Sequence, residues 1–144
     1  MNPDELAARV AHHMLAAEGS GPAWDLRIEE VREDYARVSM VVRADMLNGH
    51  GFAHGGMIFA LADSASAYVC NGANHASMAA QASIVFLDKV REGETLIAEA
   101  TEVARELGMT RAELGVRMSG AERLWWRALY ELEAAEQEDT EGGG

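Results

Sequence analysis

The stretch from Leu47 to Tyr68 reads LNGHGFAHGGMIFALADSASAY and contains one acidic side chain, Asp63, and no Lys or Arg. A carboxylate is costly to bury in an apolar helix without a partner, so its retention indicates that it has a use. Because a partly desolvated carboxylate can take a proton from water, Asp63 is a candidate general base or nucleophile. The alternative is an Asp that only hydrogen-bonds a neighbouring loop.

A second feature precedes this carboxylate: His54, Gly55 and Gly56 stand where the apolar helical pattern begins. The first four N–H groups of a helix have no partner within it, and the macrodipole adds partial positive charge there. Such donors can hold the negative charge that develops on a carbonyl oxygen under attack. Glycine allows a close approach, so the Gly55 N–H is the first choice for this donor. Alternatively, the two glycines only permit tight packing of the loop on the helix.

The spacing of Gly55 and Asp63 bears on assembly. They are eight residues apart, which is about 12 Å along a helix at ~1.5 Å per residue. Reacting groups must approach within about 3 to 3.5 Å, so the two cannot both touch one carbonyl carbon. If both are catalytic, they come from different subunits. A two-fold dimer with antiparallel helices would then contain two equivalent composite sites.

The helix that carries these residues is predicted over about 54–69, and its apolar side chains point in most directions. We therefore expect it to be enclosed on nearly all sides. A short amphipathic helix is expected at the N-terminus, opened by Asn2-Pro3. Alternating apolar and polar residues predict strands at about 24–28, 36–42, 95–101 and 111–118. A mostly apolar run predicts another at 80–87, and a last strand is expected at 124–132. An antiparallel sheet that curls around one apolar helix, an α+β fold, satisfies this order.

Composition limits the classes of protein that fit. The chain has 144 residues, with 24 acidic against 12 basic side chains and a net charge of -12. We expect one domain over 1–135 and an acidic, Gly-ended flexible tail over 136–144. The negative charge argues against a nucleic acid or an anionic membrane as partner. The lone Cys70 excludes an internal disulfide, and neither a signal peptide nor a membrane span is expected, so a cytoplasmic location fits.

The run NGHGFAHGGMIFALADSASAY, followed by FLDKVREGETLIAEATEV, resembles the hotdog-fold thioesterases of the phenylacetic acid degradation (PaaI-like) type. The resemblance extends from Trp24 to Leu132. It is strongest in a set of five residues: Asn48, His54, Gly55, Gly56 and Asp63. It implies a hotdog fold, in which the sheet wraps the helix. It also implies a homodimer with composite active sites, pairing of dimers into a homotetramer, acyl-CoA substrates, and no cofactor or metal.

The resemblance also implies an activity: hydrolysis of an acyl-CoA thioester, with a phenylacetyl- or hydroxyphenylacetyl-type acyl group, to free acid and CoA. Asp63 would be the base or nucleophile, and the Gly55 N–H would hold the thioester oxyanion. Asn48 would orient the attacking water or the carbonyl through its amide. His54 would position the loop or support the oxyanion donor.

Further substrate contacts are expected within the helix and in the strand and turn that follow it in the sequence. Relatives of this type often carry Ser or Thr on the strand after the helix, where this chain has Ala80; Gln81 or Ser83 could take over the positioning of water. Lys89 and Arg91 could contact the CoA phosphates, although loop cations are commonly just solvated. Gly56 and Phe59 complete the expected substrate-binding residues, and Phe59 is equally reasonable as a core side chain.

Two other functions remain open. One is a hotdog hydratase or dehydratase, although the His with an acidic partner that this class generally uses is not evident. The other is a non-catalytic acyl-CoA binding or regulatory module. Ala80 keeps the second alternative open, whereas Asn48, Gly55 and Asp63 argue against it.

Overall fold

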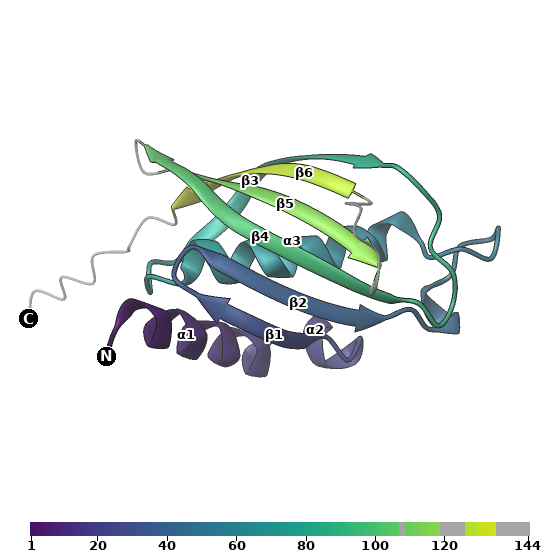
Figure 1. Cartoon of the computed structure of the whole chain (residues 1–144), viewed down its shortest axis with the longest axis horizontal. Coiled ribbons are helices and arrows are strands. Elements are labelled where there is room, and N and C mark those ends of the chain that lie inside the picture. The colour runs from purple at the N-terminus through teal and green to yellow at the C-terminus, as the bar shows by residue number, and fades with distance from the viewer. Residues whose placement is uncertain (107–108, 119–125, 135–144) are drawn as a thin grey trace, which may run out of the picture.

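The computed structural model describes residues 1–106, 109–118 and 126–134. In this part of the chain, a six-stranded antiparallel sheet curls around one long helix (Figure 1). The helical elements are α1 (Pro3–Ala17), α2 (Ser20–Ala23), η1 (Ala44–Met46) and α3 (Gly55–Asn71). The strands are β1 (Arg27–Arg32), β2 (Tyr35–Val41), β3 (Ser77–Phe86), β4 (Thr95–Glu106), β5 (Met109–Met118) and β6 (Trp126–Ala134). The predicted order of elements is thus confirmed, and the predicted tail, 136–144, lies outside the described residues.

The strand order is β1-β2-β4-β5-β6-β3. After α3 the chain therefore crosses to the far side of the sheet, where β3 pairs with β6 and becomes an edge strand. The other pairs, β1 with β2, β2 with β4, β4 with β5 and β5 with β6, are also antiparallel. β3 therefore pairs on one side only, with β6, and its other edge is unpaired within the described sheet.

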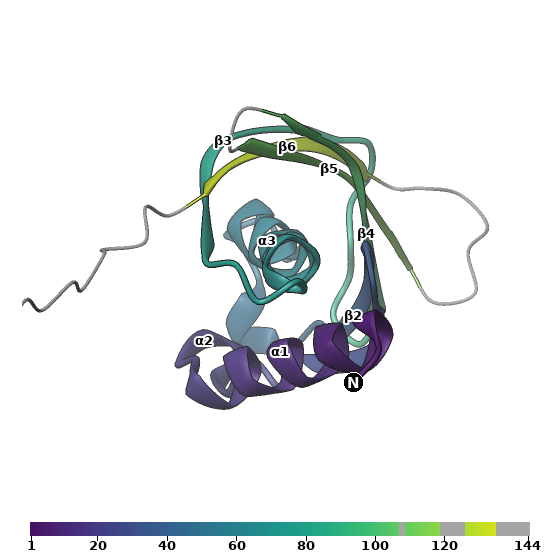
Figure 2. The ribbon, with the colours of Figure 1, turned by 90° about the vertical axis from the view of Figure 1, so that its left-hand side faces the viewer.

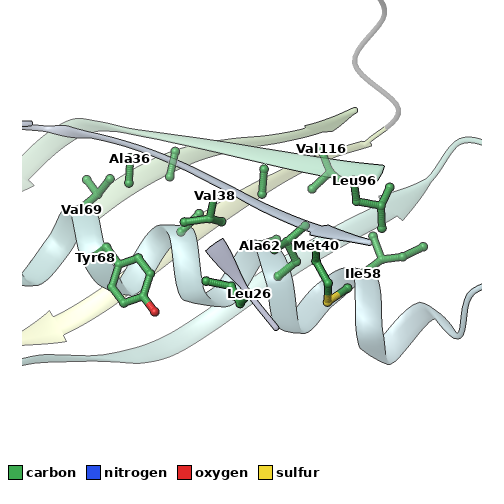
Figure 3. Packing of buried hydrophobic residues seen from close by; sticks show 14 of the residues in the cluster. Leu26, Ala36, Val38, Met40, Ile58, Ala62, Tyr68, Val69, Leu96 and Val116 are labelled. Atoms are coloured by element: carbon green, nitrogen blue, oxygen red, sulfur yellow. The ribbon is translucent and has the colours of Figure 1, made fainter. Parts of the chain in front are cut away.

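The core lies between the concave face of the sheet and α3, with α1 and α2 across the open side (Figure 2). Figure 3 shows the inward side chains of β2 and β4 meeting α3. Alternation along these strands places every second residue on that face. The fully buried members on the two strands are Ala36, Val38, Met40, Leu96, Ala98 and Ala100.

The expectation that α3 is enclosed on nearly all sides is wrong for the chain by itself. Gly56 and Asp63 are exposed, and Ala60 and Ala67 are only half-buried. These four positions, three or four residues apart, form one stripe along the helix, which we call the open stripe. Apolar spacing in the sequence cannot distinguish burial by the same chain from burial by another, which is why the prediction failed.

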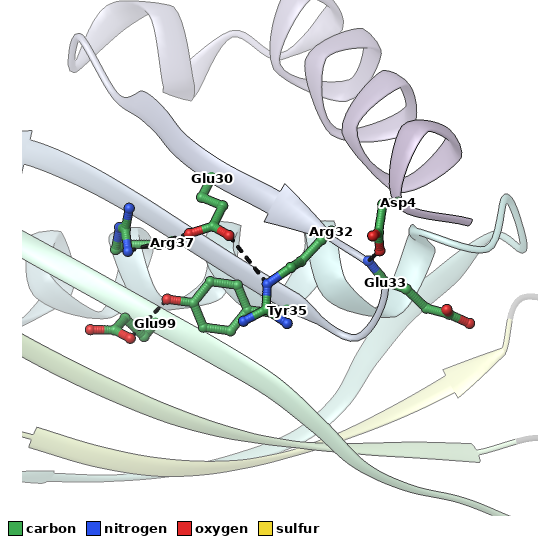
Figure 4. A network of polar contacts seen from close by, with 7 residues as sticks. All are labelled: Asp4, Glu30, Arg32, Glu33, Tyr35, Arg37 and Glu99. Carbon is green, nitrogen blue, oxygen red and sulfur yellow. Dashed lines mark hydrogen bonds and ion pairs between the residues drawn. The ribbon is translucent and has the colours of Figure 1, made fainter. Parts of the chain in front are cut away.

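Polar contacts join α1 to the turn after β1 and also link side chains on the outer face of the sheet (Figure 4). Asn2 and Glu5 form a capping box at the start of α1, and Asp4 Oδ1 accepts a hydrogen bond from the Glu33 N–H at 2.9 Å. On the outer face, the Tyr35 hydroxyl donates to Glu99 Oε2 at 2.9 Å. None of the described helices is long and apolar enough to cross a membrane.

At its other end, α1 is joined to α3 through a partly buried pair. The Tyr68 hydroxyl donates to Glu18 Oε1 at 3.0 Å, and Tyr68 is fully buried. Burial raises the pKa of Glu18, the hydrogen bond from Tyr68 opposes this, and the negative charge of Asp63 adds to it. Burial, followed by the charge of Glu18 and the hydrogen bond to it, also raises the pKa of Tyr68.

Candidate active site

The start of α3 leaves one backbone donor free. His54 is the N-cap residue, and its Nδ1 accepts the Gly56 N–H at 2.9 Å. The His54 carbonyl accepts the next two N–H groups, from Met57 at 2.9 Å and Ile58 at 3.3 Å. The Gly55 N–H makes no hydrogen bond to any residue that the structure describes. This arrangement distinguishes Gly55 from Gly56 as the donor available to an anionic ligand.

Asn48 shapes the loop that leads into this helix. Its Oδ1 accepts the N–H groups of His50 at 2.9 Å and Phe52 at 3.1 Å. Its own N–H donates to the Phe52 carbonyl at 2.7 Å. The side-chain carbonyl is therefore used within the loop, whereas the Asn48 Nδ2 has no partner among the described residues. Asn48 can still present a rigidly held amide donor.

The loop, the start of α3 and the end of β3 together enclose a pocket of about 480 Å³. It is lined by Asn48, His50, Phe52, Ala53, Gly55, Ile58, Phe86, Asp88, Lys89 and Val90. The pocket thus combines apolar walls with neutral donors, one cation from Lys89 and one carboxylate from Asp88. The Lys89 Nζ lies 5.0 Å from the centroid of the Phe52 ring. Such a cavity suits an apolar group that carries a carbonyl. A second pocket of about 460 Å³, beside Val69 and Gly72, contains none of the predicted site residues.

Asp63 lies outside this pocket. It is exposed on the open stripe and is absent from the residues that line the cavity. Eight residues of helix separate it from Gly55, about 12 Å along the axis. Within one chain, the carboxylate therefore cannot reach a carbonyl carbon whose oxygen is bound at the Gly55 N–H.

Of the other predicted residues, Lys89 lines the pocket and four do not: Gly56, Phe59, Ser83 and Arg91. Ser83 is exposed, and alternation along β3 puts it on the face opposite to Phe86. The Arg91 N–H donates to Glu94 Oε2 at 2.8 Å, which closes the turn before β4. The side chain of Gln81 lies outside the described residues.

The pocket also contains residues that the sequence did not single out, chiefly Phe86 and Asp88. The ring of Phe86 lies against the Cα of Gly55: a Cβ on Gly55 would be 2.9 Å from Phe86 Cζ. The available signal was the run FLDKV at the end of a predicted strand. Periodicity gave the face of this strand, but it could not show that the strand ends beside the start of α3.

The sequence of this chain is similar to those of known proteins. Residues 50–124 match the Thioesterase superfamily. The acyl-coenzyme A thioesterase PaaI of Escherichia coli K12 is 42% identical over 90 residues, which cover 62% of this chain and 64% of that protein. The chain spans 62% to 64% of the length of the curated relatives it matches.

Solved structures extend the similarity to nearly the whole fold. The PaaI protein from the phenylacetic acid degradation operon of E. coli has a TM-score of 0.89 and 29% identity, covering 93% of this chain and 96% of its own. A mutant of the phenylacetic acid degradation protein PaaI from Thermus thermophilus has a TM-score of 0.77 and 27% identity. That alignment covers 82% of this chain and 100% of the other.

Proposed function

Because this chain belongs to the Thioesterase superfamily and has its hotdog fold, we propose that it is an acyl-CoA thioesterase, which hydrolyses acyl-CoA to a free acid and CoA. The observation that carries this proposal is the Gly55 N–H, which has no hydrogen-bond partner among the described residues and belongs to the pocket that Asn48 also lines. A helix N-terminus is well suited to an oxyanion because its donors are fixed before the reaction begins. The thioester carbonyl oxygen accepts from the Gly55 N–H, while Asn48 orients the carbonyl or the attacking water.

Asp63 supplies the remaining chemistry. As a base it takes a proton from water, whose oxygen then bonds to the carbonyl carbon; as a nucleophile its own oxygen forms that bond, and water later cleaves the anhydride. In both routes the C–S bond breaks, the CoA sulfur takes up a proton, and the free acid is released. His54 holds the Gly56 N–H and thereby fixes the turn that presents Gly55.

The site is complete in a two-fold homodimer. The open stripe of α3 and the unpaired edge of β3 are the surfaces left for a second copy, and β3 with the residue after it exposes Met78, Val85, Phe86 and Leu87. Antiparallel packing of two α3 helices brings Asp63 of one subunit towards Gly55 of the other. Two such dimers pair into a tetramer.

The acyl group is aromatic, of the phenylacetyl or hydroxyphenylacetyl type. The aromatic side chains of the pocket and the similarity to PaaI from a phenylacetic acid degradation operon support this choice. Lys89, with Arg91 in the same turn, contacts the CoA phosphates at the mouth of the pocket. The protein acts in the cytoplasm, where its single Cys70 stays reduced.

The test is thiol release from phenylacetyl-, hydroxyphenylacetyl-, benzoyl- and straight-chain acyl-CoA. The wild type and Asp63→Asn are compared with Glu92→Gln, an exposed loop acid outside the pocket. We expect turnover by the wild type and by Glu92→Gln and none by Asp63→Asn with an unchanged circular dichroism spectrum. Bound CoA esters without thiol release from the wild type would instead indicate a binding module.

A further inference from the structure

Phe86 ends β3 with its ring turned towards α3. It shares the inner face of the strand with Ile84, which packs against the core, whereas Val85 points to the outer face. Pairing of β3 with β6 opposite Trp126 holds the backbone at this point. The Phe86 side chain is nevertheless 50% exposed and lines the pocket. The part of the ring that lines the pocket can therefore contact a molecule bound there.

The ring occupies the space directly beside the proposed oxyanion donor. A Cβ built on Gly55 would meet Phe86 Cζ at 2.9 Å and Cε1 at 3.3 Å, both tighter than ordinary contact. Glycine at this position therefore does more than let a carbonyl approach, because it also makes room for the ring. A group attached to a carbonyl carbon at the Gly55 N–H must accordingly pass along Phe86.

The second aromatic side chain of the pocket, Phe52, lies in a more polar environment. The Phe52 ring lies under the ammonium group of Lys89, 5.0 Å from its centroid, near the charged residues of the turn after β3. That side of the pocket suits the polar part of a substrate. Phe86 instead lies beside Gly55, and the apolar residues Ile58 and Val90 also line the pocket.

We propose that Phe86 is the specificity-determining side chain of the acyl pocket: its ring packs against the acyl group whose carbonyl is bound at Gly55, and so favours a flat aromatic group over a flexible alkyl chain. The proposal rests on the oxyanion role of Gly55 in the proposed function. Paired aromatic rings contribute beyond the area they bury, by an amount that corresponds to a selectivity of about 2- to 10-fold.

Binding of thioether analogues tests this without requiring hydrolysis. Calorimetry would give the Kd values of S-(2-phenylethyl)-CoA and S-hexyl-CoA for the wild type, Phe86→Leu, Phe86→Tyr and Val85→Ala. Val85→Ala is the matched control, since Val85 is an exposed neighbour on the opposite face. The solution mass of each variant is measured as well, because both residues lie near the β3 edge. We expect the preference for the phenylethyl analogue to fall about 2- to 10-fold in Phe86→Leu and to persist in Phe86→Tyr and Val85→Ala.

Three results would overturn the inference: an unchanged preference in Phe86→Leu, an equal loss in Val85→Ala, or no wild-type binding of either analogue. Thiol release separates this inference from the proposed function. If the wild type hydrolyses acyl-CoA but Phe86→Leu keeps the preference for the phenylethyl analogue, only the proposed role of Phe86 is wrong. If Phe86→Leu loses this preference but the wild type releases no thiol, Phe86 determines binding and the proposed thioesterase activity is wrong.

Discussion

At the scale of single residues, the competition for acceptors at the start of α3 decides which backbone donor can serve a ligand. His54 accepts the Gly56 N–H through its ring and two further N–H groups through its carbonyl. Gly55 is left with a donor that points to no acceptor among the described residues, at the wall of the pocket. The chemistry proposed for this protein therefore depends on one N–H group that a suitable substitution can delete.

Gly55→Pro is that substitution, and Gly55→Ala is its control. Proline removes the N–H and is favoured at the first position of a helix, and His54, with φ -61° and ψ 133°, already has the conformation that precedes proline. Both variants place a Cβ against the ring of Phe86. We expect kcat for thiol release to be about 100- to 1,000-fold lower in Gly55→Pro than in Gly55→Ala. Equal rates in the two folded variants would show that this N–H does not hold the oxyanion.

The sequence could identify these residues but not their partners. Helix-start rules and the resemblance drew attention to His54, Gly55 and Gly56, and the structure then showed that His54 holds the Gly56 N–H. Phe86 was missed because its contact with Gly55 joins positions 31 residues apart in the sequence. Local patterns describe the face of a strand, whereas a contact of this kind depends on where the strand ends in space.

At the scale of elements, alternation predicted strands such as β2 and β4 because each has one face on the core. The predicted 111–118 and the observed β5, Met109–Met118, differ by two residues at one end. The prediction of 95–101 was shorter than β4, Thr95–Glu106, because a register shift between Glu102 and Ala104 interrupts the alternation. The packing of α3 was less predictable, since an alanine-rich stripe has the same composition whether it is open or covered.

The contact between α1 and α3 gives a prediction for the pH dependence of stability. Burial, as the largest cause, raises the pKa of Glu18 in the folded chain. The stability that this carboxyl contributes is thus fully present below its unfolded pKa and is lost as the pH rises through the folded value. Glu18→Gln keeps an acceptor for the Tyr68 hydroxyl and carries no charge at any pH.

We therefore expect Glu18→Gln and the wild type to unfold alike near pH 4, and the variant to be the more stable at pH 7. The difference should stay below about 1 kcal/mol because the carboxylate is partly exposed. Urea unfolding at both pH values measures this difference in the free energy of unfolding. Glu5→Gln, in the capping box at the other end of α1, is the control variant. A wild type that gains stability over Glu18→Gln as the pH rises would contradict this account.

At the scale of the whole molecule, the described part of the chain leaves the open stripe of α3 and the edge of β3 uncovered. The proposed dimer covers both. A charged lysine on an edge strand opposes pairing of that edge with another chain. Val85→Lys is therefore expected to shift the protein from dimer or tetramer to monomer and to lower thiol release by at least tenfold, on the order of 1.4 kcal/mol.

Val41→Lys provides the matched comparison, since Val41 is similarly exposed, 50% against 58% for Val85, but ends β2 inside the sheet order. Light scattering with chromatography gives the mass, and the same fractions are assayed. A monomeric and fully active Val85→Lys would show that one chain suffices. An unchanged mass in Val85→Lys would show that β3 is not the edge that pairs.

The most direct test of the central claim mixes two inactive variants, Gly55→Pro and Asp63→Asn. In a composite site, Gly55 from one subunit meets Asp63 from the other, so each mixed dimer contains one intact site. Unfolding the two variants together in equal amounts and refolding them gives mixed dimers as half of the product at random pairing. Thiol release is therefore expected to return to about a quarter of the wild-type rate. A refolded mixture that contains the mixed dimers and remains inactive would contradict it.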